Sequence, residues 1–356
     1  MRILHVIDGL GRGGAESLLI NSIQLQPADE HVVICLSHLY DFDEGLKKQF
    51  SYYTIPVGKK LKIPGAIFKI NRIIKKHRPH IIHAHLPLSG IITKLAAPKK
   101  IPFFYTIHSE YSICYFNKNR LLKFLEKFTA RPYHHLIGVS KIAIDDYVKH
   151  ITGSGSRDVL YNFVAERFFN QDNKSAYKPG MPLHCIAVGH LKYEKNYSYI
   201  LQQFGLIKNL PITIDLYGEG DEAEKLKKIK YNKELLNVTF KGKHNNIDEL
   251  MGQYDLFISC SVTEGFGIAA LEAMAAKLPV AVSSIPVFKE IITGVGIFIE
   301  LGDAPPDVSL AGVLKNIYTG EINIANNIEP AFEKAKKIAA PQNYIVQLKS
   351  IYQKYI

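Results

Sequence analysis

The chain has 356 residues, of which 47% are hydrophobic, 11% aromatic and 22% charged, and its formal net charge is +11. This composition is typical of a globular protein and excludes a disordered or a fibrous one. The length predicts two domains of ordinary size, each large enough to bury its own core.

The first half of the chain alternates short apolar runs with amphipathic segments, which is typical of parallel βαβ units. The predicted strands are 2–7, 31–37, 81–85, 103–108 and 135–139, and the predicted helices are 15–24, 66–76, 89–97 and 120–131. A polar stretch with two prolines and a glycine follows at residues 170–182 and predicts a linker.

A second alternation follows this linker. Its predicted strands are 184–188, 212–217, 238–241, 256–259, 280–283 and 297–299, and its predicted helices are 198–204, 222–231, 247–253 and 268–276. We therefore expect an α/β protein with two Rossmann-like domains, 1–169 and 183–340. Because such sheets bind ligands at the carboxyl ends of their strands, the two domains are expected to face each other across a cleft.

The positive charge is concentrated in the first half. Residues 1–170 contain 24 Lys and Arg against 13 Asp and Glu, a difference of +11, whereas residues 171–356 contain 20 of each. This asymmetry predicts that the first domain meets an anionic partner. The sequence shows no apolar run of membrane-spanning length, no signal peptide and no paired cysteines, which favours a cytoplasmic protein without a disulfide framework or a zinc site.

A glycine-rich loop follows the first predicted strand. Gly9, Gly11 and Gly14 satisfy the pattern GxGxxG, in which glycines allow close backbone approach to a phosphate at a helix start. The loop could bind NAD, form a tight turn needed for packing, or accommodate an anion at the cleft. The NAD interpretation lacks its acidic residue, because the second strand ends in Cys35-Leu36-Ser37-His38.

Two further motifs lie in the second half. The strand-to-helix turn Gly189–Asn196 carries Lys195, either a point charge for phosphate or a solvated surface lysine. The segment Glu264–Glu272 places a carboxylate at each end of a glycine loop that opens an Ala-rich helix. Glu264 could cap that helix and Glu272 could be exposed, but a carboxylate in so apolar a helix predicts a bound partner.

Together, these motifs resemble family 4 of the retaining glycosyltransferases, which have the GT-B fold. The supporting fragments are His83-Ala84-His85, Thr106-Ile107-His108, Gly138-Val139-Ser140-Lys141, Tyr161-Asn162-Phe163-Val164 and Tyr217-Gly218-Glu219-Gly220. The resemblance implies a glycosyltransferase that needs no metal and no cofactor, with residues 341–356 forming a helix that packs back on the N-terminal domain.

The resemblance also implies roles for single residues. Lys195 would bind the donor diphosphate, Glu264 the sugar hydroxyls and Glu272 the ribose diol, and His108 would lie beside the sugar. The other implied donor-binding residues are Gly13, Gly14, Gly265, Phe266, Gly267 and Ile268. His190 stands where the family usually has arginine, which leaves the phosphate without a bidentate donor unless His190 is protonated or Arg12 or Lys192 reaches it.

The resemblance leaves the donor sugar and the acceptor open. We expect transfer of a hexosyl or N-acetylhexosaminyl unit from a nucleotide sugar, with UDP favoured by family frequency, to a glycan or lipid-linked acceptor of the cell envelope. The alternatives are a catalytically silent nucleotide-sugar-binding protein and an NAD-linked oxidoreductase. A cation site at Asp41-Phe42-Asp43 is less favoured than a solvated turn, and His77, His80, His83, His85, His134 and His135 show no metal-ligand spacing.

Segments 66–76 and 120–128 combine apolar residues at helical spacing with several cations. Such helices can lie on anionic lipid, or can pack their apolar face on the sheet with their lysines in water. No nucleic-acid-binding motif is present, and nucleic acid is not an expected partner. A peripheral location on the inner face of the cell membrane is therefore the expectation, with the basic domain toward the acceptor.

Overall fold

The structure is a computed structural model, which describes residues 1–11, 13–58, 63–151, 155–171, 177–244 and 246–356. The chain forms two compact units. Unit 1 comprises Met1–Phe163 and Pro341–Ile356, and unit 2 comprises Val164–Ala340. The division falls after Phe163 and not at the expected residue 169, so the described part of the expected 170–182 linker belongs to unit 2. Residues 172–176 of that linker lie outside the described residues.

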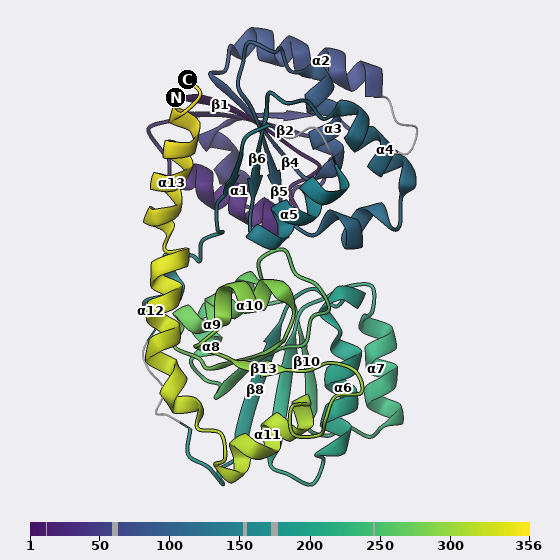
Figure 1. Ribbon diagram of the computed structural model, residues 1–356, viewed down its shortest axis with the longest axis vertical. Coiled ribbons are helices and arrows are strands. Elements are labelled where there is room, and N and C mark those ends of the chain that lie inside the picture. Colours follow the sequence, from purple (N-terminus) through teal and green to yellow (C-terminus); the bar gives the residue numbers. More distant parts are fainter. Residues whose placement is uncertain (12, 59–62, 152–154, 172–176, 245) are drawn as a thin grey trace. The chain divides into compact units, whose positions relative to one another are not determined.

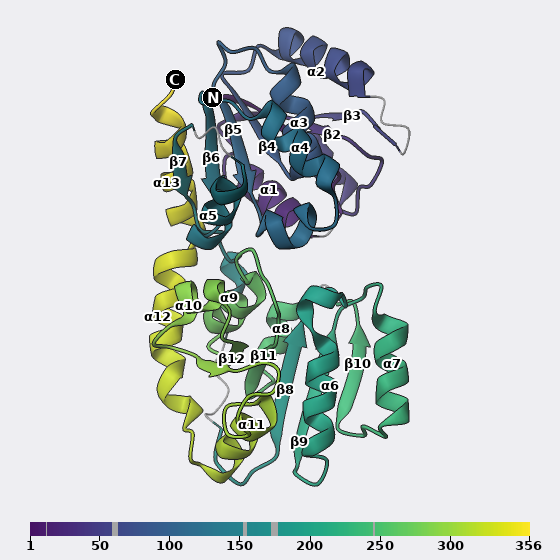
Figure 2. The same cartoon turned by 45° about the vertical axis from the view of Figure 1, so that its right-hand side comes forward.

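Unit 1 is built on a parallel sheet in the order β3-β2-β1-β4-β5-β6-β7, whose central strands are labelled in Figure 1 and whose edge strands β3 and β7 are labelled in Figure 2. Its strands are β1 Arg2–Ile7, β2 Glu30–Cys35, β3 Ser51–Thr54, β4 Ile81–His85, β5 Phe103–Ile107, β6 His134–Gly138 and β7 Arg157–Val159. The central strands β1 and β4 are buried almost throughout, which explains why they are nearly continuous apolar runs. The order reverses direction beside β1, which is the switch point where doubly wound sheets bind ligands.

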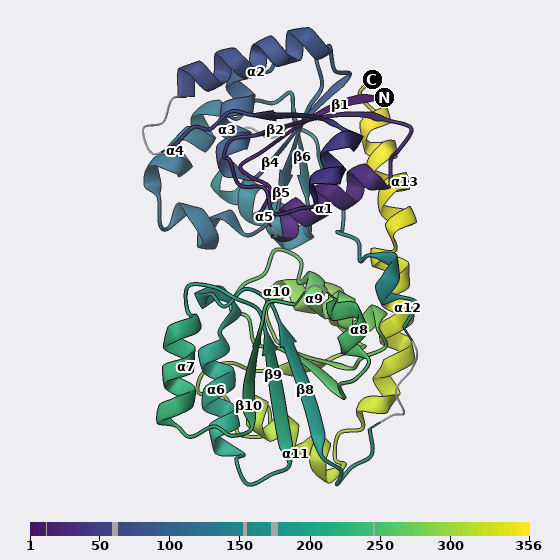
Figure 3. The same cartoon turned by 180° about the vertical axis from the view of Figure 1, so that it is seen from behind.

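Helices cover both faces of this sheet (Figures 1 and 3). They are α1 Gly14–Gln24, α2 Ile63–His77, α3 Pro87–Ala96, α4 Arg120–Thr129, α5 Lys141–His150 and α13 Pro341–Gln353. Helix α13 comes from the far end of the chain, and its Leu348, Ile351 and Tyr352 join one buried cluster with Ile3 and Phe104 of the sheet. Residues 341–353 are therefore part of the core of unit 1.

Unit 2 has a parallel sheet in the order β10-β9-β8-β11-β12-β13. Its strands are β8 Leu183–Val188, β9 Ile212–Tyr217, β10 Val238–Gly242, β11 Leu256–Ser259, β12 Val280–Ser283 and β13 Ile297–Ile299. Its helices are α6 Tyr197–Leu206, α7 Ala223–Asn232, α8 Ile247–Met251, α9 Ile268–Ala275, α10 Pro286–Ile292, α11 Leu310–Thr319 and α12 Ile328–Ala339. Figure 2 shows α6 and α11 over one face of this sheet, and α9 packs against β11 and β12.

Both units are doubly wound α/β sheets, which confirms the predicted fold class. The unit boundary sharpens the charge asymmetry, because unit 1 contains 25 Lys and Arg against 12 Asp and Glu, a net +13. Unit 2 contains 19 against 21, a net −2. No described helix combines the length and the apolar character that a membrane crossing requires.

Candidate functional site

The first site element of unit 2 is the turn between β8 and α6. The chain leaves β8 at Gly189, forms a short 3₁₀ turn at Tyr193–Lys195 and enters α6 through Asn196, whose φ of 53° is left-handed. The Tyr197 hydroxyl donates a hydrogen bond of 3.1 Å to the Gly189 carbonyl, which pins the two ends of the turn together. The turn therefore holds Lys195 at the carboxyl edge of the sheet, the edge at which such folds bind ligands.

Lys195 contacts the loop that follows β11. Its Nζ lies 2.5 Å from Oε1 of Glu264, and the same oxygen accepts a 2.8 Å hydrogen bond from the Ser261 hydroxyl. The Val262 amide donates to the Glu194 carbonyl at 2.9 Å, so main chain as well as side chains join the two loops. The structure thus brings together Lys195 and Glu264, which belong to two separate sequence motifs.

Gly267, which ends the glycine loop, is the N-cap of helix α9. Gly267 has φ 75° and ψ 45°, and a Cβ at this position would overlap the Phe288 ring. Both observations require glycine here. The N-cap of α9 is thus a glycine that makes no side-chain capping hydrogen bond, and Glu264 lies three residues before it. Its first amide groups carry the positive end of the helix dipole, which suits a phosphate.

Glu272 lies within α9, among buried apolar neighbours. Burial raises the pKa of this carboxyl from its usual 4.5 to about 7, while the charges of Arg167 and Lys195 partly oppose the shift and Asp248 adds to it. Arg167 in turn pairs with Asp248, with Nε and Oδ1 3.2 Å apart. Sequence reasoning missed Arg167 and Asp248, because neither lies near Glu272 in the sequence or in a recognisable motif.

His190, Lys192 and Arg12 are the residues that could take the place of the family arginine at the donor phosphate. His190 and Lys192 are both exposed, next to the turn that holds Lys195. Arg12 lies outside the described residues. Of the basic side chains of this turn, Lys195 is therefore the most enclosed.

In unit 1, helix α1 begins at Gly14, directly after Gly13. A Cβ on Gly13 would overlap the Glu16 carboxylate, whereas one on Gly14 would meet open space. Asp8, at the end of β1, accepts a 2.7 Å hydrogen bond from the Ser89 amide in the first turn of α3, and burial raises the pKa of its carboxyl. Sequence reasoning did not single out Asp8.

His108 directly follows β5 and is half-buried. Its Nε2 lies 3.3 Å from Nδ1 of His85, the last residue of β4. Burial lowers the pKa of His108 to about 3. His108 is therefore a neutral imidazole at neutral pH, able to donate one hydrogen bond and accept one.

Within the described residues, the group of His, Cys, Asp or Glu side chains close enough to share a metal ion is His5, His83 and His85, whose ligand atoms lie within 4.8 Å of one another. The sequence analysis did not consider His5, which β1 brings beside His83 and His85 from a distant part of the sequence. Asp43 caps a 3₁₀ helix by accepting a hydrogen bond from the Gly45 amide, in line with a structural turn at residues 41–43.

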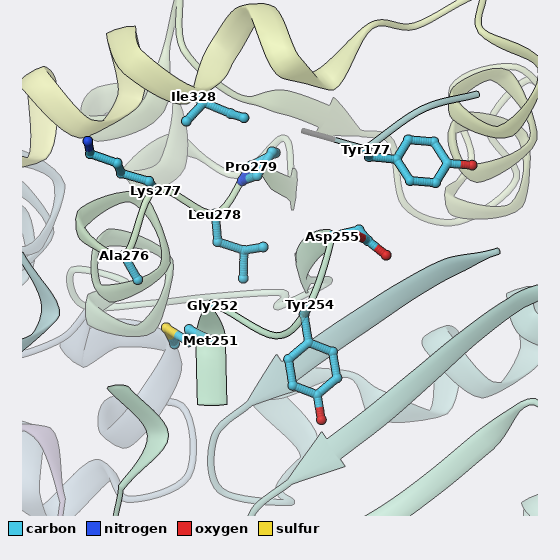
Figure 4. Close-up of a pocket in the computed structure, with 10 residues that line it drawn as sticks. All are labelled: Tyr177, Met251, Gly252, Tyr254, Asp255, Ala276, Lys277, Leu278, Pro279 and Ile328. Carbon is cyan, nitrogen blue, oxygen red and sulfur yellow. The ribbon is translucent and has the colours of Figure 1, made fainter. Parts of the chain in front are cut away.

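A small pocket of about 30 Å³ lies elsewhere in unit 2 (Figure 4). Asp255 and Pro279, which line it, immediately precede β11 and β12, so the pocket lies at the amino ends of these strands. Lys195 and Glu264 follow the carboxyl ends. The pocket is too small for a sugar nucleotide and is not part of the candidate site.

Comparison with known proteins covers most of the chain. A model described as Glycosyltransferase Family 4 matches residues 12–167, and one described as Glycosyl transferases group 1 matches residues 169–301. The O-antigen chain mannosyltransferase RfbU of Salmonella typhimurium is 31% identical over 205 residues, 55% of this chain and 54% of that protein. The N-acetyl-alpha-D-glucosaminyl L-malate synthase of Bacillus anthracis is 23% identical over 248 residues, 66% of this chain and 65% of that protein.

This chain thus spans between about half and two thirds of the length of these two relatives. Among solved structures, Anabaena HepE in complex with UDP and glucose matches with a TM-score of 0.82 over 99% of this chain and 100% of that chain, at 17% identity. At this identity the likeness shows the fold alone, in which two Rossmann-like domains follow one another.

Proposed function

Because the chain is a glycosyltransferase of the family 4 type with the GT-B fold, we propose that it transfers a hexosyl or N-acetylhexosaminyl unit from a UDP-sugar to a glycan or lipid-linked acceptor. The mannosyltransferase RfbU, named for O-antigen chains, supports an envelope glycan as acceptor. The HepE structure holds UDP and glucose, which supports UDP as the nucleotide.

The contact between Lys195 and Glu264 carries this proposal. It places a cation and a carboxylate side by side at the carboxyl edge of the sheet, and Glu264 lies in the loop that leads into α9. Lys195 and the backbone amides of Gly265, Gly267 and Ile268 would bind the diphosphate of the donor. Glu264 would accept hydrogen bonds from sugar hydroxyls, and Glu272 from the ribose diol. From unit 1, His108 would face the sugar and Gly13 and Gly14 the phosphate.

The proposed chemistry is transfer with retention of the anomeric configuration. The bond between the anomeric carbon and the phosphate oxygen breaks while the acceptor oxygen bonds to the same face of that carbon, and the acceptor's proton passes to the departing phosphate. Lys195 and the helix-start amides stabilise the negative charge that develops on that phosphate. The proposal requires no metal ion, because these groups supply the positive charge.

A ligand screen tests this function. Thermal shift against UDP, several UDP-sugars, GDP-mannose and NAD should show stabilisation by UDP and by one UDP-sugar, since a ligand that binds only the folded state raises its stability. Slow hydrolysis of that UDP-sugar would separate an enzyme from a silent binding protein. Stabilisation by NAD alone would contradict the proposal.

We also propose that unit 1 docks on an anionic membrane surface through α4. In this helix the usual burial is reversed. Its buried residues are Glu126 and Thr129, whereas Leu121, Phe124 and Phe128 are about 60% exposed. Soluble helices normally bury such residues, so an exposed apolar ridge indicates a contact with something apolar.

Buried polar contacts on the sheet side hold α4 in this orientation. The Glu126 carboxylate pairs with Lys94 of α3, both side chains being fully buried, and accepts hydrogen bonds from the hydroxyls of Tyr105 and Tyr147 at 2.9 and 2.8 Å. Because Glu126 of α4 points into the core to meet Lys94 of α3, the opposite side of α4, which carries Leu121, Phe124 and Phe128, faces outward. Turning α4 over would break this pair and leave an uncompensated buried charge, which is strongly unfavourable.

Charge complements the ridge. Arg120 and Lys127 are exposed on the same helix, and unit 1 has a net charge of +13, which suits anionic headgroups beside a buried apolar ridge. Helix α2 differs, because its Ala66, Ile70 and Ile74 are buried and its cations face solvent. Phe68 of α2 is nevertheless 70% exposed, but it is a single apolar side chain, so the proposed inner-face location rests on the ridge of α4.

A further inference from the structure

A row of four imidazole rings crosses the sheet of unit 1 and ends at His108. Nε2 of His108 lies 3.3 Å from Nδ1 of His85, and Nε2 of His85 lies 3.4 Å from Nδ1 of His5. Nε2 of His5 lies 3.2 Å from Nδ1 of His31, and Nε2 of His31 lies 3.4 Å from the Gln26 carbonyl oxygen. We call these four rings the histidine row.

The strand register explains the row. His31 lies opposite Ile3 on β1, and His85 lies opposite Ile7. Both isoleucines are two residues away from His5, and side chains two residues apart in a strand point to the same face. The first three rings therefore share a face, and the fourth lies two residues beyond the β5 partner of His85.

The contact of His31 with the Gln26 carbonyl sets the direction in which hydrogen bonds are donated along the row. A neutral imidazole has one N–H and one lone pair, and burial lowers the pKa of each ring in the row, so all four are neutral at neutral pH. The Gln26 carbonyl can only accept, so Nε2 of His31 must carry its proton. Nδ1 of His31 then accepts from Nε2 of His5, and the same assignment passes through His85 to His108.

We infer that the histidine row fixes His108 as its Nε2–H tautomer and presents its unprotonated Nδ1 as a hydrogen-bond acceptor for a hydroxyl group of the donor sugar. Within the part of the chain that the structure describes, this nitrogen has no hydrogen-bond partner, because the ring of His108 contacts His85 through Nε2. His85, His5 and His31 are positioning residues, because they act on the sugar only through His108. The identity of the hydroxyl rests on the proposed function, whereas the tautomer does not.

The bonds around His83 argue against a metal ion at this place. Nδ1 and Nε2 of His83 lie 2.6 Å from the Tyr352 and Thr106 hydroxyls, so a metal would have to displace one of these short bonds. Both ring nitrogens of His5 and His85 are engaged within the row. Satisfied hydrogen bonds account for every ring nitrogen of the three residues.

Nitrogen NMR of the histidine side chains in the intact protein tests the inference. Long-range proton–nitrogen correlation distinguishes a protonated from an unprotonated ring nitrogen, and single substitutions assign the signals. At pH 7.5 we expect protonated Nε2 and unprotonated Nδ1 in His31, His5, His85 and His108. A proton on Nδ1 of His108, a cationic ring in the row, or a stoichiometric metal ion in the purified protein would overturn the inference.

Two variants add a kinetic reading. His31→Phe removes the anchored acceptor, so His108 should show mixed tautomers and the KM for the donor should rise roughly tenfold with a smaller change in kcat, the effect of one weakened hydrogen bond. His31→Gln retains an acceptor and a donor and should restore both readings, and His184→Gln in unit 2 should change neither. An unchanged His108 tautomer in His31→Phe would refute the directing role of the row.

The NMR result is independent of turnover. If no sugar nucleotide bound while His108 kept the expected tautomer, the proposed function would fail and the tautomer assignment would stand. If the sugar nucleotide bound while His108 carried its proton on Nδ1, the reverse would hold.

Discussion

Nζ of Lys195 lies 2.5 Å from Oε1 of Glu264, although 69 residues separate them in the chain. Both side chains are largely enclosed, with 19% and 12% of their surface exposed. An anionic diphosphate that reaches Lys195 must therefore compete with Glu264. This competition distinguishes the effects that we expect from substituting each partner.

Lys195→Ala should lower turnover by roughly 10²–10³, the effect of losing one preorganised group that stabilises charge on the leaving phosphate. Initial rates with the UDP-sugar found in the ligand screen give the measurement. Lys228→Ala removes one exposed cation of α7 and is the matched control, which should keep normal turnover. Near-normal turnover of a well-folded Lys195→Ala protein would refute the role of Lys195.

Glu264→Gln should separate nucleotide binding from catalysis. Without the carboxylate, Lys195 is available to phosphate, so UDP should inhibit at an equal or lower concentration than in the wild type. The kcat should fall by roughly 10–10², because a charged acceptor of sugar hydroxyls is replaced by a neutral one. A weaker affinity for UDP with unchanged kcat would show that Glu264 serves the nucleotide and not the sugar.

Glu272→Gln should make the protein more stable at pH 8. The folded-state pKa of about 7 lies above the usual 4.5, so the folded protein holds this proton more tightly than the unfolded chain does. The free energy of unfolding therefore falls as pH rises from about 4.5 to about 7. The variant has no such carboxyl group and should be more stable than the wild type by about 3 kcal/mol at pH 8.

Urea unfolding at pH 8 and pH 5 measures this difference, which should shrink at the lower pH. The same variant should bind UDP roughly tenfold more weakly, as expected from losing a charged hydrogen bond to the ribose. Equal stability of variant and wild type at both pH values would show that Glu272 is not strained by burial.

Gly267→Ala should destabilise unit 2 by about 2–4 kcal/mol, because it adds a Cβ at φ 75° and overlaps the Phe288 ring. Gly302→Ala is the matched control, since Gly302 has φ 78° but open space around it, and should cost only about 1 kcal/mol. Chemical unfolding of both variants separates the steric part from the conformational part. Similar losses in the two would mean that Phe288 moves aside without cost.

Phe124→Ser combined with Phe128→Ser should weaken binding to anionic vesicles at low salt by tenfold or more, because two aromatic side chains no longer enter the lipid. Stability should change by less than about 1 kcal/mol, since both rings are exposed. Leu236→Ser, at an exposed apolar position of unit 2, is the control in vesicle sedimentation. Absence of binding by the wild-type protein would contradict the membrane proposal.

The fold was largely predictable because its buried strands are compact apolar runs. The predicted bounds of β1, β4, β9, β11, β12 and β13 agree with the structure to the residue. Two edge strands were missed, namely β3, Ser51–Thr54, and β7, Arg157–Val159, because an edge strand is partly solvated and needs no apolar run. Helices α5, α10, α11 and α12 were missed as well.

The sequence predicted which residues belong to the candidate site, but not which of them contact each other. Glycine-rich turns and an isolated carboxylate drew attention to Lys195, Glu264 and Glu272, whereas the pairing of Lys195 with Glu264 depends on how β8 and β11 lie side by side. His5 and His31 escaped notice because a single histidine in an apolar strand carries no signal of its own. Only strand register places them in one row.

Helix α13 affects the order in which the two units can finish folding during synthesis. Unit 1 contains both the first 163 residues and Pro341–Ile356, so the sequence of unit 2 is inserted within that of unit 1. During synthesis, unit 2 leaves the ribosome while the sheet of unit 1 still lacks Leu348, Ile351 and Tyr352 over one face. That face stays uncovered until α13 has been synthesised, so the first unit to be translated is the last to be completed.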